Sequence, residues 1–268
     1  MSLLSVVIVN YRSEDLLQSC LTSLFGNDSL VDDQIFVVNN GVPEELASFE
    51  KSAWPKLRLI QNPSNLGFGR AANRGYHSSQ SEFVLLLNPD VRVEPQAVHR
   101  LLQTMQANLK AGIVLPRLKN PDGALQYSCR RFYSYQTLLM RRGPWKNRFS
   151  NHRLVRQHLM MDWDHKSLKV VDWGLGAAMM IRRSAAGREL FDERFFLYFE
   201  DVDLCFGIHK RGWKVLYNPD AGMVHHHLRE SAKAYSLRVK GYHFLSMMKF
   251  LWKQNMELKG KNCHEEVD

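Results

Sequence analysis

Two short acidic segments, far apart in the chain, carry the residue types best suited to chemistry. The first is the turn Asn88-Pro89-Asp90, which directly follows the expected strand at residues 82–87, apolar from Phe83 onward. A carboxylate held at a strand end by a proline can bind a hard divalent cation, and the cation can in turn bind diphosphate oxygens. Such a cation stabilises the negative charge that a leaving diphosphate gains. A Pro-Asp turn is also an ordinary strand terminator, so Asp90 alone leaves both interpretations open.

The second acidic segment is Glu200-Asp201-Val202-Asp203, which follows the aromatic residues 195–199. Aromatic rings shield a carboxylate from water and raise its pKa toward the range that suits a general base. A base of this kind would take the proton from an attacking hydroxyl. Acidic residues also stabilise the N-terminus of an ordinary helix through its dipole, which is the simpler interpretation of the same residues.

Two further motifs could hold a metal or a phosphate. In His225-His226-His227 the three adjacent imidazoles cannot all point one way in a strand, so one could face a site, although a surface loop explains the triplet equally well. A catalytic zinc site is not indicated, because no HExxH motif or His/Cys spacing accompanies these histidines. Residues 65–75 place glycines and small residues at a helix start, where N–H groups face anions, or where a helix simply packs tightly on a sheet.

The first half of the chain alternates apolar runs with amphipathic stretches, as expected of an α/β fold with a Rossmann-like, mainly parallel sheet flanked by helices. The expected strands are 3–9, 34–38, 57–61, 82–87 and 112–115, and the expected helices are 13–25, one opening at Pro43, 67–78 and 95–108. Ligands bind beyond the carboxyl ends of such strands. The polar residues Asn10, Asn39, Asn65 and Asp90 end these strands or follow them, so we expect them to converge on one edge.

The second half is less regular and strongly basic. Between residues 129 and 170 periodicity fails around Gly143-Pro144, which predicts a long, partly helical insertion. Order returns with expected strands at 177–181 and 214–217 and a helix from Glu200. Residues 232–258 show a basic amphipathic helix pattern. We therefore expect an α/β domain at 1–231, with a basic insertion at 130–169, and a C-terminal helix and tail at 232–268.

Composition bounds the protein class without choosing a function. The chain has 268 residues, 45% of them hydrophobic, and a net charge of +9. Ten basic residues against two acidic ones lie in 130–169, which suits nucleic acid, an anionic membrane or a phosphorylated substrate. The apolar run 3–9 is too short to span a bilayer and lacks the flanks of a signal peptide, which predicts a cytoplasmic protein. The four cysteines lie far apart, without the spacing of a disulfide framework or zinc ribbon.

Five motifs in a fixed order bring these observations together. They are Val-Val-Ile-Val-Asn-Tyr, Asn-Leu-Gly-Phe-Gly-Arg-Ala-Ala-Asn-Arg-Gly, Leu-Leu-Leu-Asn-Pro-Asp, Gly-Ala-Ala-Met-Met-Ile-Arg-Arg and Phe-Asp-Glu-Arg-Phe-Phe-Leu-Tyr-Phe-Glu-Asp-Val-Asp-Leu-Cys. Over residues 3–231 the sequence resembles family 2 glycosyltransferases, most of all the bacterial rhamnosyltransferases of O-antigen and cell-wall assembly. The resemblance implies a GT-A fold, a nucleotide-diphosphate sugar donor and inversion by direct displacement.

The resemblance also implies a role for each matching residue. Asp90 stands at the metal-binding end of a DXD-like turn whose degenerate first position is Asn88, and Asp201 stands at the catalytic base, with Glu200 and Asp203 in support. The donor-binding positions are Asn10, Tyr11, Asn65, Gly67, Phe68 and Asn73, and the metal-ligand histidine is His225 or His226. Asn39 occupies a donor-binding position that is an Asp in many relatives; an amide still hydrogen-bonds there but lacks the charge.

These roles predict that Mg²⁺ or Mn²⁺ on Asp90 and a histidine holds the donor, for which dTDP-L-rhamnose is the best candidate. The acceptor is expected to be a glycan or a polyprenyl-diphosphate-linked sugar in lipopolysaccharide or other surface polysaccharide synthesis. The basic insertion and the 232–258 helix then suit peripheral attachment to the anionic inner face of the plasma membrane. Ordinary packing of that helix on the domain is the alternative.

Two other classes of function stay open on the sequence alone. A nucleic-acid-binding module would explain the charge, but the basic residues show no recognition-helix or RNP pattern and the acidic motifs would have no role. A sugar nucleotidyltransferase shares the sheet and the metal carboxylate. It should carry a glycine-rich, lysine-containing loop after the first strand, where this chain has Asn10-Tyr11-Arg12-Ser13.

Overall fold

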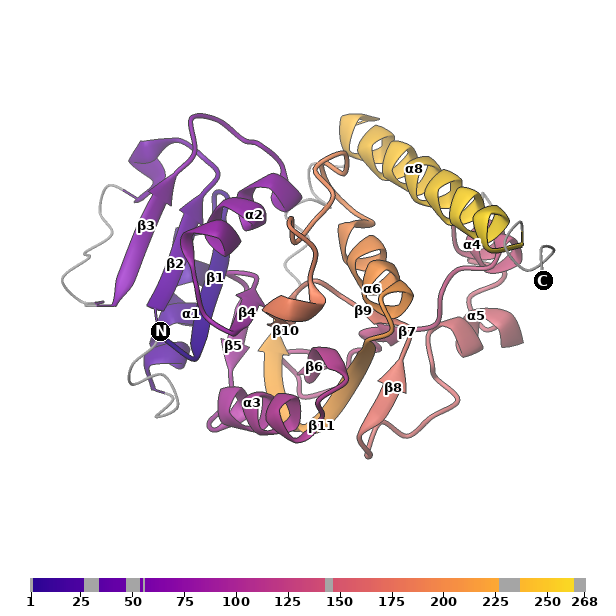
Figure 1. The fold of residues 1–268 in the computed structure, drawn as a ribbon, viewed down its shortest axis with the longest axis horizontal. Helices are drawn as coiled ribbons and strands as arrows, with labels where there is room; N and C mark the ends of the chain where they lie inside the picture. Colours follow the sequence, from indigo (N-terminus) through magenta and orange to yellow (C-terminus); the bar gives the residue numbers. More distant parts are fainter. Residues whose placement is uncertain are drawn as a thin grey trace.

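A central β-sheet with helices on both faces forms the body of the protein (Figure 1). The computed structural model describes residues 2–26, 34–46, 54, 56–142, 147–226 and 237–262. The strands are β1 (Leu4–Asn10), β2 (Gln34–Asn39), β3 (Leu57–Gln61), β4 (Phe83–Leu87), β5 (Val91–Val93), β6 (Ala111–Lys119), β7 (Cys129–Arg130), β8 (Lys169–Val171), β9 (Trp173–Gly174), β10 (Ala178–Arg182) and β11 (Lys214–His225). The helices are α1 (Glu14–Phe25), α2 (Phe68–Ser78), α3 (Ala97–Ala107), α4 (Tyr135–Arg142), α5 (Arg153–His158), α6 (Glu200–Lys210) and α8 (Leu237–Asn262), with short 3₁₀ turns at Pro43–Leu46 and Arg183–Ala185.

The sheet has the strand order β3-β2-β1-β4-β10-β6-β11-β5. Strand β8 pairs with the first part of β11, at Val215–Tyr217, and β5 pairs with its end. Its first four strands are mutually parallel, so their carboxyl ends share one edge. Strand β10 runs antiparallel to both β4 and β6, which restores the common direction in β6 and β11. Strands β7 and β9 pair separately as a small ribbon.

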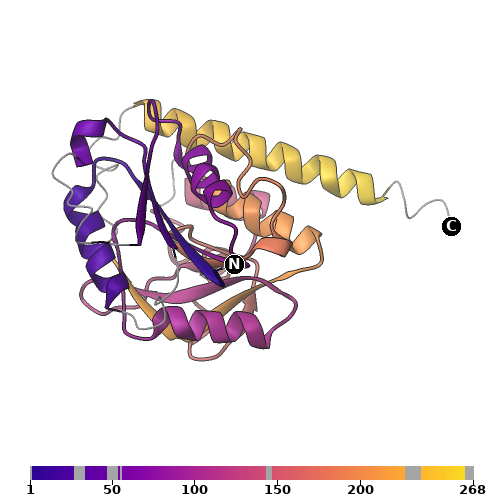
Figure 2. The same ribbon diagram turned by 60° about the vertical axis from the view of Figure 1, so that its left-hand side comes forward.

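Both faces of the sheet are covered, which explains why its central strands are apolar along their whole length. In β1, Val7 and Val9 face the layer of α2 and α6, whereas Val6 and Ile8 face the layer of α1 and α3. All seven residues of β1 are buried. Figure 2 shows α1 and α3 on one side of the sheet and α2 on the other.

The expected mainly parallel α/β architecture is confirmed, and the predicted ends of the strands through β4 are within about two residues of the observed ones. Three details differ. Strand β10 separates β4 from β6, strand β11 continues past Tyr217 to His225, and Ser13 donates its hydroxyl to the Tyr11 carbonyl instead of capping α1. The continuation of β11 accommodates a register shift between Asn218 and Gly222, so its histidines end a strand. The expected insertion is partly helical, through α4 and α5.

Helix α8 lies along the outside of the molecule against α6 (Figures 1 and 2). The Phe250 ring is fully buried, and its centroid lies 5.8 Å from Phe199 and 6.0 Å from Phe206. The Lys253 ammonium donates to Asp203 at 2.8 Å. Within the described ranges, no helix has both the length and the apolar content needed to cross a bilayer.

Two helix glycines form a matched pair that tests the packing of α2. A Cβ on Gly75 would lie 2.4 Å from Val7 Cγ1 and 3.1 Å from Val38 Cγ2, whereas one on Gly241 would meet nothing within 4 Å. Gly75→Ala should therefore destabilise the protein by about 1–3 kcal/mol, because α2 must move off the sheet. Gly241→Ala should stabilise α8 by about 0.5–1 kcal/mol. Urea denaturation measures both, and equal effects at the two positions would contradict the packing.

Candidate active site

The two acidic segments meet through the backbone that leads into β10. The Asn88 amide donates to the Ala177 carbonyl at 2.8 Å, which ties the Asn88-Pro89-Asp90 turn to this stretch. One residue earlier, the Gly176 amide donates to the Asp201 carboxylate at 3.1 Å. The turn after β4 and the first turn of α6 are thus held on adjacent residues. Segments more than a hundred positions apart in the sequence become neighbours at one sheet edge.

Asp90 faces His225, the last residue of β11. The Asp90 Oδ2 lies 3.4 Å from His225 Nε2, and both side chains are largely buried. Gln126 holds the other side of the imidazole, with its Oε1 2.9 Å from Nδ1. The Gln126 amide nitrogen donates to the His225 carbonyl and to Asn120, so its oxygen is left to accept. Neutral His225 therefore carries its proton on Nδ1 and presents the lone pair of Nε2 toward Asp90.

This pair fits a divalent cation. In the part of the chain that the structure describes, the buried Asp90 Oδ1 has no hydrogen-bond partner, which costs free energy that a bound cation would offset. A carboxylate oxygen and an imidazole nitrogen fixed by Gln126 are a suitable set of donors. Among the residues that the structure describes, no cluster of three His, Cys, Asp or Glu side chains surrounds them. A protein site with two ligands leaves positions for phosphate oxygens and water.

His226 contacts the Asp90 turn through its backbone. The His226 amide donates to the Asp90 carbonyl at 2.9 Å, which helps to fix the turn. Within the described ranges, His225 is the histidine whose imidazole lies against the Asp90 carboxylate, so the geometry favours His225 as the metal ligand. His227 lies outside the described residues.

Backbone amides hold the Asp201 carboxylate at the start of α6. Its Oδ2 accepts from Gly176 and its Oδ1 accepts from the Val202 amide at 2.8 Å. Burial raises the pKa of Asp201, and these hydrogen bonds and the charge of Arg130 act in the opposite direction. Arg130 itself stacks on Trp173, with 5.1 Å between its guanidinium carbon and the ring centre. A carboxylate with a raised pKa, oriented by two fixed donors, can act as a general base.

Glu200 is buried beside Asp201. Its Oε2 has no hydrogen-bond partner within the described part of the chain. Burial, with the neighbouring Asp201 charge, raises the pKa of Glu200 well above its ordinary value. Tyr198 and Phe199, just before it, have φ values of +68° and +67°, which non-glycine residues rarely adopt. Backbone strain of this kind concentrates at functional sites, and here it precedes the two carboxylates directly.

Asp203 supports the site from outside. Its carboxylate pairs with Lys253 of α8, whose Nζ lies 2.7 Å from Oδ1 and 2.8 Å from Oδ2. Lys253 also contacts Asp192 at 3.3 Å. Asp203 therefore fastens α8 to α6, and its negative charge is matched there.

Of the strand-end residues predicted to converge, Asn10 and Asn39 lie side by side at the carboxyl edge of β1 and β2. Asn10 and Asn39 are register partners, and the Asn10 amide donates to Asn39 Oδ1 at 3.4 Å. The Asn10 Oδ1 is buried without a partner among the described residues. Tyr11, next along the chain, is exposed. An unpaired amide oxygen beside an exposed ring is suited to a ligand's polar groups.

Two residues expected to bind the donor are buried and make hydrogen bonds within the fold. Asn39 is fully buried, and its amide donates to Gln61 and to the Val42 carbonyl. Asn73 is also buried, and its amide exchanges two hydrogen bonds with the Phe191 backbone. These hydrogen bonds fix the loop and the sheet edge, and contact of Asn39 and Asn73 with the donor stays a prediction. Their partners lie too far along the chain for the sequence to suggest them.

An asparagine network that the sequence analysis missed connects the edge to α2. The Asn40 side chain donates to Asn65 and accepts from Asn62 and from the Leu66 amide. Asn65 in turn accepts from the Gly67 amide at 2.9 Å. The signal available was the polar triplet Asn39-Asn40-Gly41 directly after a buried strand. Asn65 is thus held at the site edge by Asn40.

The motif around Gly67 packs on the loop that precedes α6. Gly67 has a φ of +84°, and a Cβ there would lie 2.4 Å from the Phe196 carbonyl oxygen. The Phe68 amide donates to that oxygen at 3.1 Å, and the Phe68 ring lies against Phe191. Glycine is required because both the conformation and the close approach exclude a side chain.

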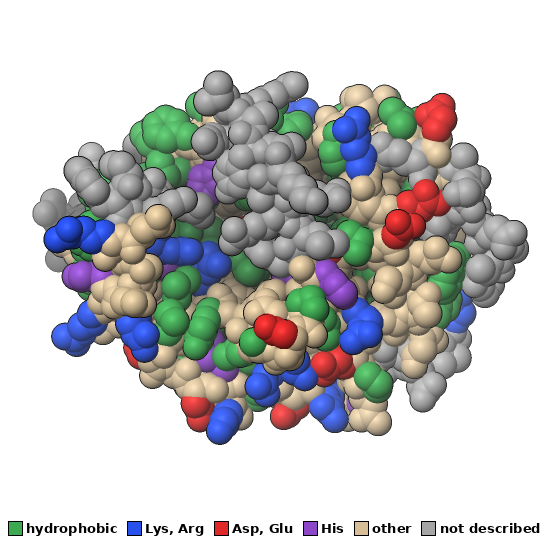
Figure 3. All heavy atoms as spheres, turned by 180° about the vertical axis from the view of Figure 1, so that it is seen from behind, with side chains coloured by type: hydrophobic (Ala, Val, Ile, Leu, Met, Phe, Trp, Pro, Cys, Tyr) green, Lys and Arg blue, Asp and Glu red, His purple; other side chains and the backbone are tan. Residues whose placement is uncertain are grey.

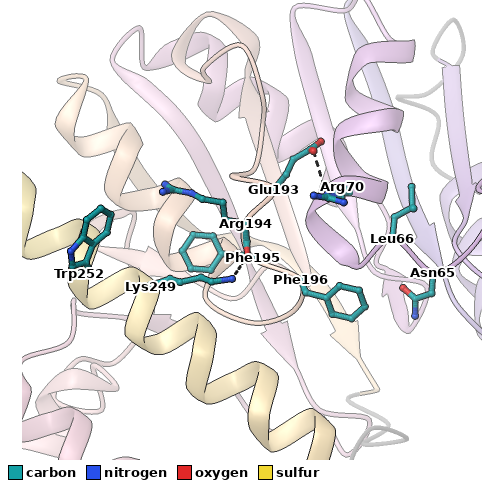
Figure 4. Close-up of a pocket in the computed structure, with 9 residues that line it drawn as sticks. All are labelled: Asn65, Leu66, Arg70, Glu193, Arg194, Phe195, Phe196, Lys249 and Trp252. Carbon is teal, nitrogen blue, oxygen red and sulfur yellow. Dashed lines mark hydrogen bonds and ion pairs between the residues drawn. The ribbon is translucent and has the colours of Figure 1, made fainter.

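A pocket of about 580 Å³ opens beside this contact (Figure 4). Its walls come from the start of α2, the loop before α6 and α8, and they comprise Asn65, Leu66, Arg70, Glu193, Arg194, Phe195, Phe196, Lys249 and Trp252. Neither Asp90 nor Asp201 lines it, so the pocket does not contain the two carboxylates. Of the basic side chains in these walls, Arg70 forms an ion pair with Glu193.

Comparison with known proteins identifies glycosyltransferases that resemble this chain. The model of glycosyl transferase family 2 matches residues 5–168. The N-acetylglucosaminyl-diphospho-decaprenol L-rhamnosyltransferase of Mycobacterium tuberculosis is 29% identical over 90% of this chain and 81% of its own length. Rhamnosyltransferase WbbL of Escherichia coli K12 is 23% identical over 94% of this chain and 96% of its own.

Solved structures show the same fold at low identity. The mannosyltransferase PcManGT of Pyrobaculum calidifontis, in complex with GDP-Man and Mn²⁺, aligns with a TM-score of 0.60 at 16% identity over 93% of this chain. The chain spans between 42% and 64% of the length of the solved structures it matches. These neighbours are GT-A glycosyltransferases, so the expected GT-A architecture is confirmed.

Removing Gln126 should weaken metal binding without touching a metal ligand. Gln126→Leu removes the acceptor that fixes the tautomer of His225, and loss of such an orienting group typically costs about 10–100-fold in affinity. Calorimetric titration of Mn²⁺ in the presence of a nucleoside diphosphate measures the change. Gln103→Leu, on the exposed side of α3, should bind Mn²⁺ as the wild type does. Unchanged affinity in Gln126→Leu would contradict the assigned role.

Buried Glu200 makes stability depend on pH in a direction that can be measured. With its pKa raised in the folded state, the unfolded chain releases the proton first, so stability falls as the pH rises from the ordinary Glu range toward the raised value. Glu200→Gln removes this loss, and its gain in unfolding free energy should be larger at pH 8 than at pH 5, by about 1 kcal/mol or more. Glu44→Gln, at an exposed position, should show no such trend.

Proposed function

The chain belongs to glycosyl transferase family 2, and from that premise we propose that it transfers L-rhamnose from dTDP-L-rhamnose to a lipid-linked or polysaccharide acceptor, with inversion at the anomeric carbon. Both relatives are named rhamnosyltransferases, which supports L-rhamnose as the transferred sugar. The diphospho-decaprenol in the name of one of them supports an acceptor carried on a polyprenyl diphosphate. The observation that carries the proposal is the Gly176-Ala177 backbone, which brings the Asp90 turn and Asp201 together.

Asp90 and His225 are the residues that would hold Mg²⁺ or Mn²⁺. When bound, the ion neutralises charge on the donor diphosphate and so favours its departure. A solved neighbour carries Mn²⁺ with a nucleotide sugar, which supports a divalent cation in general. Gln126 keeps the imidazole in the tautomer that such a role requires.

The donor would lie along the carboxyl edge of β1, β2 and β4. Asn10, through its unpaired oxygen, and the exposed Tyr11 are the side chains available to the nucleoside. Asn65, Gly67 and Phe68 form the opposite wall, fixed by Asn40 and by the Phe196 carbonyl. Asn39 and Asn73 shape this wall from behind.

Asp201 would remove the proton from the acceptor hydroxyl as that oxygen attacks the anomeric carbon. Gly176 and Val202 fix the two carboxylate oxygens, so a basic lone pair is presented in one direction. The raised pKa keeps the carboxylate basic enough to share the proton in the transition state. Since the ionised form is the base, activity should fall as the pH is lowered through this raised pKa.

Replacing the base should separate chemistry from donor binding. Asp201→Asn keeps the shape of the side chain but cannot accept the proton, so kcat should fall about 10²–10⁴-fold. Donor affinity, measured by calorimetry with Mn²⁺, should stay within about twofold, because the donor does not depend on this group. Asp162→Asn, in an exposed pair with Arg131, is the control and should keep full activity. An Asp201→Asn enzyme with wild-type turnover would refute the assignment.

A further inference from the structure

Helix α8 turns a set of large apolar side chains toward solvent. Phe244, Leu245, Met248 and Trp252 are 57%, 54%, 48% and 61% exposed. At 100° per residue they lie within about a third of the helix circumference, together with Gly241 and with no charged residue between them. The outward face of a surface helix is normally polar. An exposed apolar strip of this kind indicates contact with another phase or partner.

The opposite side of α8 is fixed, so the apolar face cannot simply rotate inward. Tyr242 stacks on Phe196, with 4.5 Å between ring centroids, and the Ser246 hydroxyl donates to the Leu197 carbonyl at 2.9 Å. Phe250 is buried, and Lys253 is bound to Asp203. These contacts cover about three turns of the helix. The strip from Phe244 to Trp252 faces outward as a consequence.

We propose that this strip, the apolar face of α8, docks on an anionic lipid bilayer. Leu237–Asn262 contains six basic residues and one acidic residue, which complements anionic head groups. Lys249 lies on the flank of the strip and is exposed. An interfacial helix of this type buries its apolar side chains at the head-group boundary while basic residues contact phosphates. Tryptophan is enriched at this depth.

The size of the strip argues against a second copy of the chain as the occupant. Four half-exposed side chains of this kind offer on the order of 400 Å². A stable protein interface buries about 800 Å² on each partner. Basic residues on both copies would also repel each other. The face of the molecule seen in Figure 3 shows Lys and Arg side chains scattered among acidic and apolar ones, so the basic residues visible there form no single patch.

Docking would also place the pocket of Figure 4 at the lipid surface. Trp252 belongs both to the strip and to the pocket wall, and Lys249 lines the pocket beside it. Asn65 and Leu66 form the far wall, next to the donor edge. This step rests on the proposed function, because it requires an acceptor carried by a lipid. The docking itself depends only on α8.

Vesicle flotation tests the docking without donor or acceptor. The full chain should float with vesicles of 70% phosphatidylcholine and 30% phosphatidylglycerol, and much less with phosphatidylcholine alone or in 0.5 M NaCl. Leu245→Gln/Trp252→Gln should weaken binding to the anionic vesicles about tenfold or more, because two inserted side chains become polar. Leu109→Gln/Leu168→Gln, at exposed apolar sites elsewhere, should bind as the wild type does.

Three outcomes would overturn the proposal. The first is a wild type that does not bind the anionic vesicles, and the second is a Leu245→Gln/Trp252→Gln variant that binds them as tightly as the wild type. The third is a wild-type dimer in light scattering that this variant converts to a monomer. All four positions are exposed, so both variants should melt at the wild-type temperature. Transfer to a water-soluble acceptor should be unchanged in Leu109→Gln/Leu168→Gln, and its absence in the wild type would count against the proposed function instead.

Discussion

The site depends on the backbone of Gly176 and Ala177. One amide of this stretch binds the carboxylate that begins α6, and the next carbonyl accepts from the turn that carries Asp90. Both groups sit at the point where antiparallel β10 enters the sheet between β4 and β6. Because β10 is hydrogen-bonded on both sides, the two carboxylates are positioned by the entry to an interior strand. A change in the register of β10 would move both together.

The Asp90 and Asp201 carboxylates lie in different surroundings, which suit them to different roles. On the β4 side, Gln126 fixes the tautomer of His225, so Asp90 faces a lone pair suited to a cation. On the α6 side, burial raises the pKa of Asp201, and two amides orient it. Lys253 neutralises Asp203, the third carboxylate of that segment. The same ion pair fastens α8, so the helix that we propose as a lipid-docking element is anchored one turn from the proposed base.

The sequence was sufficient for the parts of the fold that follow from local pattern. Continuous apolar runs identified β1 to β4, and the rule that polar residues at parallel strand ends share an edge correctly placed Asn10 beside Asn39. The antiparallel direction of β10 was not accessible, because a buried strand has the same apolar pattern in either direction. The length of β11 was hidden by Asn218-Pro219-Asp220, which resembles a turn but lies inside a strand at a register shift. Amide partners such as Asn73 and the Phe191 backbone, 118 positions apart, also leave no local signal.

The central claim is a division of labour in which Asp90 and His225 bind the ion and Asp201 does not. Anomalous X-ray diffraction from crystals grown with Mn²⁺ and a nucleoside diphosphate tests it most directly. The account predicts one manganese peak within bonding distance of an Asp90 oxygen and of His225 Nε2, with the diphosphate on its open side and Asp201 outside the coordination sphere. A manganese ion bound by Asp201, or one that leaves Asp90 without contact, would contradict it.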